Sequence, residues 1–279
     1  MISTKIILDS VNSVGNRLTT FELTYPRFIH SEFMTHRVLS KNAASSRAIP
    51  IEKMIQKVEE NPAAVVWWGK NQSGMQAKEE LHGTVQQDCI NQWNMAREGC
   101  IEKARTMYNL GLHKQIVNRI LEPFMNITVI CTGTEWSNFF ALRCHEDAQP
   151  EIRELAFHML RDYYDHAPTE LFTGHWHTPY ILQEEEDLDE ELKLKISAAR
   201  CARVSYLTHD GKRSHEKDLE LFDRLLSSGH MSPFEHVACA FPGIDSGNFK
   251  GWKQYRKKFS TENRTEIPSR EEVERYFNR

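Results

Sequence analysis

The sequence lacks several features that would each define a class of protein. Its six cysteines are scattered and form no C-x-x-C pair: Cys89, Cys100, Cys131, Cys144, Cys201 and Cys239. Scattered thiols are typical of a reducing cytoplasm and argue against structural zinc. No apolar run approaches the roughly 18 residues that span a membrane, and the N-terminus lacks the apolar core of a signal peptide. We therefore expect a cytoplasmic protein that binds neither a membrane nor a metal.

The chain also lacks the positive charge that proteins binding nucleic-acid polymers usually carry. Lys and Arg number 35 against 39 Asp and Glu, which gives a formal net charge of -4. The hydrophobic fraction of 40% is enough for an ordinary core. There is no internal repeat, and the acidic run at residues 184–191 is the best candidate boundary. Because nothing forces a division, we expect a single domain over residues 1–279.

Hydrophobic patterning predicts both strands and helices. Strands are expected over residues 5–9, 18–25 and 126–131, with a turn at Gly15-Asn16 joining the first two. The clearest amphipathic helix covers residues 151–164. Further helices are expected from Phe28 into the thirties, over 51–59, and over 77–110 with a break near Gly83. Another is expected from 113 to before Pro123. After the acidic run, one helix is expected to continue to about residue 204 and another to cover 218–228. The acidic run is interpreted as a solvated linker or helix start.

Residues 35–47 are the most informative stretch. They bring together two arginines, a histidine, an asparagine and three serines. Arginine supplies charge, and serine and asparagine supply short hydrogen bonds, so the stretch suits a phosphate and a flat heterocycle. It has no Gly-rich loop and is therefore neither a P-loop nor a dinucleotide fingerprint. The alternative is a polar helix start with solvated charges.

Four further clusters carry groups that suit binding or catalysis. They are Arg119-Ile120-Leu121-Glu122-Pro123, the segment from Ser137 to Arg153, Ala202-Arg203-Val204-Ser205-Tyr206, and the segment from Gly229 to Val237.

With these clusters the chain resembles the flavin-dependent thymidylate synthases. The family signature matches at His36, Arg37, Ser40, Asn42, Ser45 and Arg47. The segment from Asn138 to Arg143, followed by Ala148-Gln149, matches a second family motif. Ala-Arg-Val-Ser and Gly-His-x-Ser-Pro-Phe-Glu-His are also present, but near the C-terminus, whereas in the family they precede the signature. The chain therefore resembles a circular permutant, with the permuted segment at about residues 192–245.

The resemblance implies a role for each matched residue. Arg143 would be the catalytic arginine that polarises the pyrimidine. Ser45, Ser46 and Arg47 would hold the nucleotide phosphate, and Arg119 would be a further nucleotide-binding arginine. Cofactor contacts are implied for His36, Arg37, Asn138, Ser205 and His236.

The resemblance also implies a mixed α/β (α+β) fold with long helices, a homotetramer and active sites shared between subunits. The implied reaction moves a one-carbon unit from methylenetetrahydrofolate to C5 of dUMP. Reduced FAD then supplies hydride, and NADPH reduces the flavin. No protein nucleophile is required. The partners would be the nucleotide and the folate, with no nucleic-acid polymer.

Four positions depart from the family pattern. Thr35 replaces the first arginine of the signature, Ala43 replaces a glutamate, Glu32 replaces a glutamine, and Asp147 replaces a histidine. An ionised carboxylate only accepts hydrogen bonds, and cytosine offers an amino donor where uracil does not. Glu32 therefore makes dCMP an alternative substrate, and the four changes together make a hydroxymethylase of dUMP or dCMP an alternative activity.

Gln254 and Arg256 lie in a basic, aromatic segment and are candidates to replace the missing positive charge by contacting flavin phosphates or folate. The competing interpretation is a solvated C-terminal helix.

Three weaker candidates remain. Cys144 invites comparison with nucleophilic thiols, but a small buried residue is the commoner role. His175 and His177 would face a metal together only in an extended segment. Trp67-Trp68 would either stack on a pterin or close a hydrophobic lid.

Overall fold

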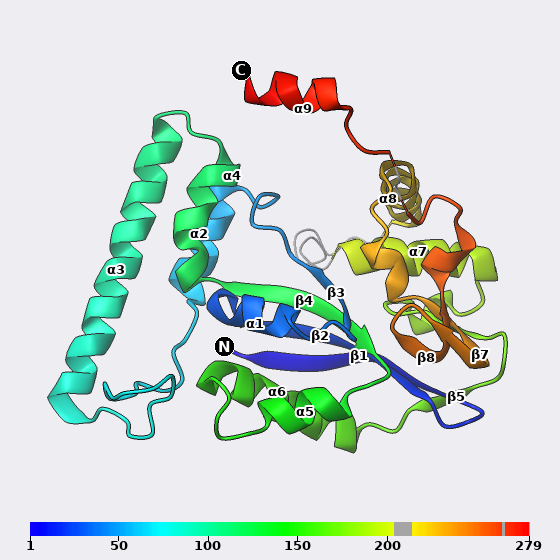
Figure 1. Cartoon of the computed structure of the whole chain (residues 1–279), viewed down its shortest axis with the longest axis horizontal. Helices are drawn as coiled ribbons and strands as arrows, with labels where there is room; N and C mark the ends of the chain where they lie inside the picture. The colour runs from blue at the N-terminus through cyan, green and yellow to red at the C-terminus, as the bar shows by residue number, and fades with distance from the viewer. Residues whose placement is uncertain (204–213, 264–265, 279) are drawn as a thin grey trace.

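The computed structural model describes residues 1–203, 214–263 and 266–278 (Figure 1). Its centre is a five-stranded sheet in the order β3-β4-β2-β1-β5. β1 and β5 run parallel and every other pair runs antiparallel, so the sheet is mixed, as the resemblance implied. The strands are β1 (Ser3–Asn12), β2 (Arg17–Pro26), β3 (Ser40–Ala43), β4 (Asn126–Gly133) and β5 (Thr169–Leu171).

The hairpin of β1 and β2 forms where the alternating pattern predicted it. Gly15 adopts φ +84° in the turn, which side-chain-bearing residues rarely adopt. β2 lies between β1 and β4, and its Phe21, Leu23 and Tyr25 are fully buried. The centre of the sheet is therefore fixed by β2, and the rest of the core is assembled on it.

Helices α5 (Ser137–Arg143) and α6 (Pro150–Asp165) lie together below the sheet in Figure 1. The predicted amphipathic helix is confirmed as α6. Its Ile152, Leu155, Ala156 and Met159 are fully buried in the same core as β2 and β4. Burial of such side chains contributes roughly 1.5–3 kcal/mol each, so this face holds α5 and α6 in place.

A second core joins α2 (Ile51–Glu60), α3 (Gly83–Asn109) and the 3-10 helix η2 (Asn118–Phe124), which follows α4 (Lys114–Val117). The predicted helix over 77–110 is wrong at its start, because α3 begins only at Gly83. Residues 64–82, here called the roof segment, are irregular. The helix expected to stop before Pro123 instead continues as η2, which contains Pro123.

The helix predicted from Phe28 is short. It consists of η1 (Arg27–Ile29) and α1 (His30–Met34). Ser40 to Ala43 instead form β3, whose backbone pairs with the edge of β4. The polar-helix interpretation of residues 35–47 is therefore wrong, because pairing with β4 outweighs local propensity.

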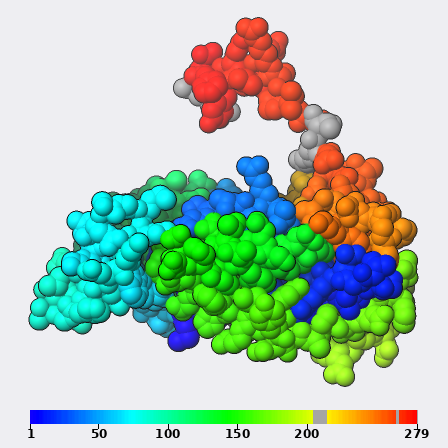
Figure 2. Space-filling model, turned by 60° about the horizontal axis from the view of Figure 1, so that its bottom comes forward, coloured from blue at the N-terminus to red at the C-terminus, as the bar shows by residue number. Residues whose placement is uncertain are grey.

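The C-terminal third has its own sheet and core. β6 (Trp176–His177), β7 (Ala238–Ser246) and β8 (Phe249–Gln254) pair antiparallel. The helices are η3 (Gln183–Glu185), α7 (Glu190–Ala202), α8 (His215–Ser228), η4 (Ser232–Glu235), η5 (Tyr255–Lys258) and α9 (Arg270–Phe277). α9 has no buried residue and extends away from the body (Figure 2).

The acidic run is not simply solvated. Glu185 is 6% exposed, and its carboxylate accepts hydrogen bonds from the guanidinium of the fully buried Arg200. Arg200 also pairs with Asp218 of α8 at 3.0 Å. The run therefore joins α7 and α8 through a buried ion-pair network, which a sequence pattern does not show. Within the described residues, no helix is long and apolar enough to cross a membrane.

Candidate active site

Three predicted residues meet at the C-terminal end of α5. The Nε of Arg143 donates to Nε2 of His36 at 2.9 Å, and its Nη1 lies 3.4 Å from Oε2 of Glu32. Glu32 belongs to α1, and His36 follows it closely. The two contacts use different nitrogens of the guanidinium and so fix its plane. We call this set the Arg143 cluster.

His36 is a neutral orienting group. Burial lowers its pKa to about 4, and the charges of Arg143 and Lys41 act in the same direction. Since Nε2 accepts the hydrogen bond from Arg143, the ring proton belongs on Nδ1. His36 therefore holds the guanidinium without competing with it as a cation.

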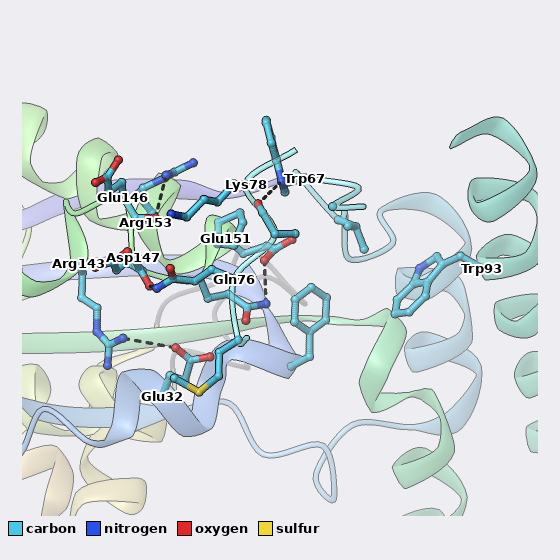
Figure 3. A pocket seen from close by; sticks show the side chains of 18 residues that line it. Glu32, Trp67, Gln76, Lys78, Trp93, Arg143, Glu146, Asp147, Glu151 and Arg153 are labelled. Carbon is cyan, nitrogen blue, oxygen red and sulfur yellow. Dashed lines mark hydrogen bonds and ion pairs between the residues drawn. The ribbon is translucent and has the colours of Figure 1, made fainter. Parts of the chain in front are cut away.

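The Arg143 cluster faces a cavity of about 940 Å³. Figure 3 shows Arg143 and Glu32 on one side and Trp93 on the opposite side. The roof segment contributes Trp67 and covers the space. Two hydrogen bonds hold this segment down: Val66 N donates to Glu151 at 3.0 Å, and Gln76 Nε2 donates to the Asp147 carbonyl at 2.8 Å. The volume lies within the range for small-molecule sites.

A second cluster forms around one oxygen of Glu122, in η2. Ser46 Oγ donates to Oε1 at 2.8 Å, and Arg119 Nη1 lies 2.7 Å from the same atom. Arg27 Nη2 is a second cation there, at 3.5 Å. Two predicted nucleotide-binding residues, Ser46 and Arg119, are thus brought together. The sequence motifs did not include Arg27. The one feature that could have drawn attention to it is its position as a cation directly after Pro26, where the second strand ends.

Ser45 and Arg47 flank Ser46 and are exposed. Both lie on the loop that carries Ser46 from β3 toward α2. Their side chains are therefore accessible to solvent next to Ser46.

Arg37 lines a second, smaller cavity of about 460 Å³ together with Ser40, Gln254 and Arg256. Gln254 is only 2% exposed, and Arg256 pairs with Glu235 and Glu262. The solvated-helix interpretation of Gln254 and Arg256 is therefore wrong. Both residues share a cavity with a predicted cofactor-binding residue.

His236 is fully buried at the end of a chain of hydrogen bonds. Its Nδ1 contacts Thr132 Oγ1, which contacts Thr20 Oγ1, which contacts His177 Nε2, each at 2.8 Å. His177 Nδ1 in turn contacts Ser10 Oγ at 2.8 Å. Burial lowers the pKa of both histidines to about 3, so both are neutral. The Nε2 of His236 has no hydrogen-bond partner among the described residues.

The metal interpretation of the His175-Trp176-His177 segment is not supported. His177 is committed to Ser10 and Thr20. Across the described ranges no group of three or more His, Cys, Asp or Glu could hold a metal ion.

Other candidates stand apart from these clusters. Asn138 is exposed near the start of α5, and Ser205 lies outside the described residues. Thr35 Oγ1 donates to the Glu32 carbonyl at 2.7 Å and so caps the C-terminal end of α1. Burial raises the pKa of the Cys144 thiol, which keeps it protonated.

Two more departures from the family pattern have a local structural place. Ala43 lies in β3. The Asp147 side chain is 62% exposed and lies 3.6 Å from His145.

Comparisons with known proteins concern the family and the fold of the chain. The family model described as thymidylate synthase complementing protein matches residues 17–169, more than half of the chain. No curated protein sequence matches this chain. A similar solved structure is the UMP/dUMP methylase PolB from Streptomyces cacaoi bound with 5-Br dUMP. It has a TM-score of 0.50 and 15% identity, over 59% of this chain and 90% of that chain. The same enzyme bound with 5-Br UMP gives 0.47 and 16%, over 59% and 89%. At these identities the likeness concerns the fold alone.

Proposed function

Because the chain belongs to the thymidylate synthase complementing protein family, it is a one-carbon transferase, and we propose that its reaction is flavin-dependent methylation of dUMP at C5. The one-carbon donor is methylenetetrahydrofolate, the flavin is FAD, and NADPH is the reductant. The product is dTMP.

The observation that carries this proposal is the Arg143 cluster at the wall of the large cavity. A guanidinium is always charged and donates two parallel hydrogen bonds. Placed against the O2 and N3 edge of a pyrimidine, it stabilises the negative charge that develops on the ring as C5 becomes nucleophilic. His36 holds the guanidinium in that orientation, and the roof segment excludes water from the base.

The residues around the smaller cavity fit a flavin. His236 is fully buried and directly follows Glu235 of the cavity wall; its Nε2, which has no partner among the described residues, is assigned to a heteroatom of the cofactor because the family motif implies a cofactor contact there. Arg37 is exposed at the cavity wall, where its charge can pair with a phosphate. When bound and reduced, the flavin supplies the hydride that completes the methyl group. The chain's own groups bind, orient and polarise, and none of them is needed as a nucleophile.

The test is to purify the protein, measure flavin absorbance, and incubate dUMP with methylenetetrahydrofolate with and without NADPH. We expect bound flavin and a nucleotide heavier than dUMP by one CH2 group, formed only with the reductant. A colourless protein that leaves dUMP unchanged under all of these conditions contradicts the proposal.

One observation favours a second candidate, a hydroxymethylase that acts on dCMP or dUMP. Glu32 presents a carboxylate beside Arg143, at 3.4 Å, on the cavity wall. If Arg143 holds the O2 and N3 edge, the acceptor-only Glu32 suits the amino group of cytosine at position 4. In this reaction water rather than hydride ends the sequence, and the product carries one more oxygen than the methyl product.

Glu32→Gln separates the two substrates. An amide both donates and accepts, so the variant is expected to shift the ratio of kcat/KM for dCMP over dUMP toward dUMP by about tenfold or more. An unchanged ratio removes Glu32 from base recognition.

A further inference from the structure

The carboxylate of Glu122 has an unusual set of neighbours. Groups from three segments lie at its Oε1: Ser46 and Arg119 donate hydrogen bonds to it, and Arg27 forms an ion pair with it at 3.5 Å. Ser46 lies on the loop before α2, Arg119 lies in η2 and Arg27 lies in η1. Two cations and a hydroxyl on one oxygen are the partners that a phosphate oxygen receives in a protein.

The surroundings carry an excess of positive charge. Arg47 is exposed beside Ser46, and Lys114 Nζ donates to the Ala48 carbonyl of the same loop at 3.1 Å. Glu122 is the only carboxylate in contact with this set among the described residues. Its side chain is 21% exposed, so solvent and small anions reach it.

We propose that Glu122 occupies the place of the substrate phosphate in the empty enzyme, and that the arriving phosphate displaces it and takes Ser46, Arg119 and Arg27 as ligands. The inference rests on the proposed function for the identity of the nucleotide, though not for the anion. Arg27 becomes a phosphate ligand that the sequence motifs did not indicate.

An internal carboxylate in this position has two effects. It keeps the guanidinium groups of Arg27 and Arg119 from repelling each other while the site is free. It also competes with every incoming anion, so a ligand that brings only a phosphate binds weakly, and contacts of the base at the Arg143 cluster are needed as well. The same residue therefore preorganises the site and raises its selectivity.

The alternative is that Glu122 is only a structural clamp that ties η1, η2 and the loop before α2 together. The two interpretations predict opposite results for Glu122→Gln. A clamp weakened by the substitution loosens the anion site. An internal competitor whose charge is removed leaves the site stronger, because the amide oxygen still accepts from Ser46 but no longer opposes the phosphate.

The experiment measures binding of inorganic phosphate, dUMP and deoxyuridine by isothermal titration calorimetry. For Glu122→Gln we expect about five- to tenfold tighter binding of phosphate and of dUMP, with deoxyuridine unchanged. For Arg27→Ala we expect about tenfold weaker binding of phosphate and dUMP, again with deoxyuridine unchanged. Glu59→Gln is the matched control, because Glu59 pairs with Arg105 at 2.9 Å on the surface of α2 and α3. It should change none of the three affinities.

Phosphate affinity that is unchanged or lower in Glu122→Gln overturns the proposal, as does wild-type phosphate binding that Arg27→Ala does not weaken. If Glu122→Gln does not fold, Glu122→Asp, whose shorter side chain withdraws the carboxylate, is expected to tighten phosphate binding in the same direction. If phosphate responds as expected but dUMP binds no better than phosphate, the inference holds and the proposed nucleotide substrate fails.

Discussion

At the scale of single residues, Arg143 is the group on which the chemistry depends. Its guanidinium holds His36 with one nitrogen and faces Glu32 with another. A lysine keeps the positive charge but is a single point donor, and it cannot make both contacts in one plane.

Arg143→Lys should therefore lower turnover of the nucleotide by about a hundredfold or more, with little change in the unfolding temperature. Steady-state kinetics and thermal unfolding measure the two effects. Arg153→Lys is the control, since Arg153 lines the same cavity and its side chain donates, within the described part of the chain, only to the backbone carbonyl of Glu146. Equal losses in the two variants would show that charge in the cavity, and not the fork of Arg143, supports the reaction.

Cys144 lies next to Arg143 and is predicted to have no chemical role. Burial raises the pKa of its thiol, so little thiolate is present near neutral pH. Cys144→Ser should keep turnover within about twofold of the natural enzyme. A variant that binds nucleotide normally but has no activity would instead identify Cys144 as a nucleophile.

The sequence predicted much of the site at this scale. The motifs singled out Arg143, Glu32 and His36 separately, the first two for the nucleotide and His36 for the flavin, and the structure brings them together, as it does Ser46 and Arg119. The sequence could not indicate Arg27, because its contact with Glu122 joins η1 to η2, and the two residues are 95 positions apart in the chain. Residue type and spacing carry no information on such a contact.

At the scale of elements, prediction succeeded where the hydrophobic period alone decides the structure. β1 and β2 contain short runs rich in apolar and β-branched residues, and α6 has a helical period with a buried apolar face. Prediction failed where contact with a segment distant in sequence determines the local structure. Residues 40–43 become a strand because β4 offers an edge, and residues 77–82 leave the helix to build the roof segment over the cavity.

The hydrogen-bond chain across β2 and β4 yields a prediction about stability. Thr20 lies opposite Thr132, and Thr24 lies opposite Thr128. The Thr20 hydroxyl is buried and joins His177 to Thr132, whereas the Thr24 and Thr128 hydroxyls form a part-buried pair at 3.3 Å. Thr20→Val leaves buried polar partners unsatisfied and Thr24→Val does not.

We expect Thr20→Val to lower the free energy of unfolding by about 2–3 kcal/mol and Thr24→Val by less than about 1 kcal/mol. Urea unfolding of the two variants measures the difference. Equal losses would mean that the chain from Ser10 to His236 adds nothing beyond an ordinary pair of threonines.

At the scale of the whole molecule, two fully buried neutral histidines make the fold sensitive to acid. The pKa of both His177 and His236 is lowered to about 3 by burial, against about 6.5 in an unfolded chain. The unfolded state then binds more protons than the folded state between these values. Their stabilisation is complete above about pH 6.5 and is lost as pH falls toward 3.

His177 and His236 alone should therefore lower the free energy of unfolding by roughly 4 kcal/mol between pH 7 and pH 5, at up to about 1.4 kcal/mol per histidine per pH unit. His30 and His36, whose pKa values are lowered to about 4, act in the same direction. Denaturant unfolding at the two pH values tests this. A stability that does not change between them would contradict the neutral, buried state of these rings.

The order of the segments and the assembly of the chain are proposed from the family resemblance. The family match ends at residue 169, so the segment at about 192–245, proposed to be permuted, lies outside it. We propose a homotetramer with shared active sites, in which the Arg143 cluster of one subunit works with the phosphate ligands of another. Mixing unfolded Arg143→Ala and Arg119→Ala chains and refolding them together should then restore turnover that neither variant has alone. Mixed tetramers without activity would place both clusters in one subunit's site.

The most direct test of the central claim is the mass of the nucleotide formed from dUMP by the purified protein with methylenetetrahydrofolate and NADPH. Methyl transfer that depends on the Arg143 cluster predicts a product heavier by one CH2 group from the natural enzyme, and almost none from Arg143→Lys. A protein that binds dUMP and flavin but returns the nucleotide with its mass unchanged would contradict the account.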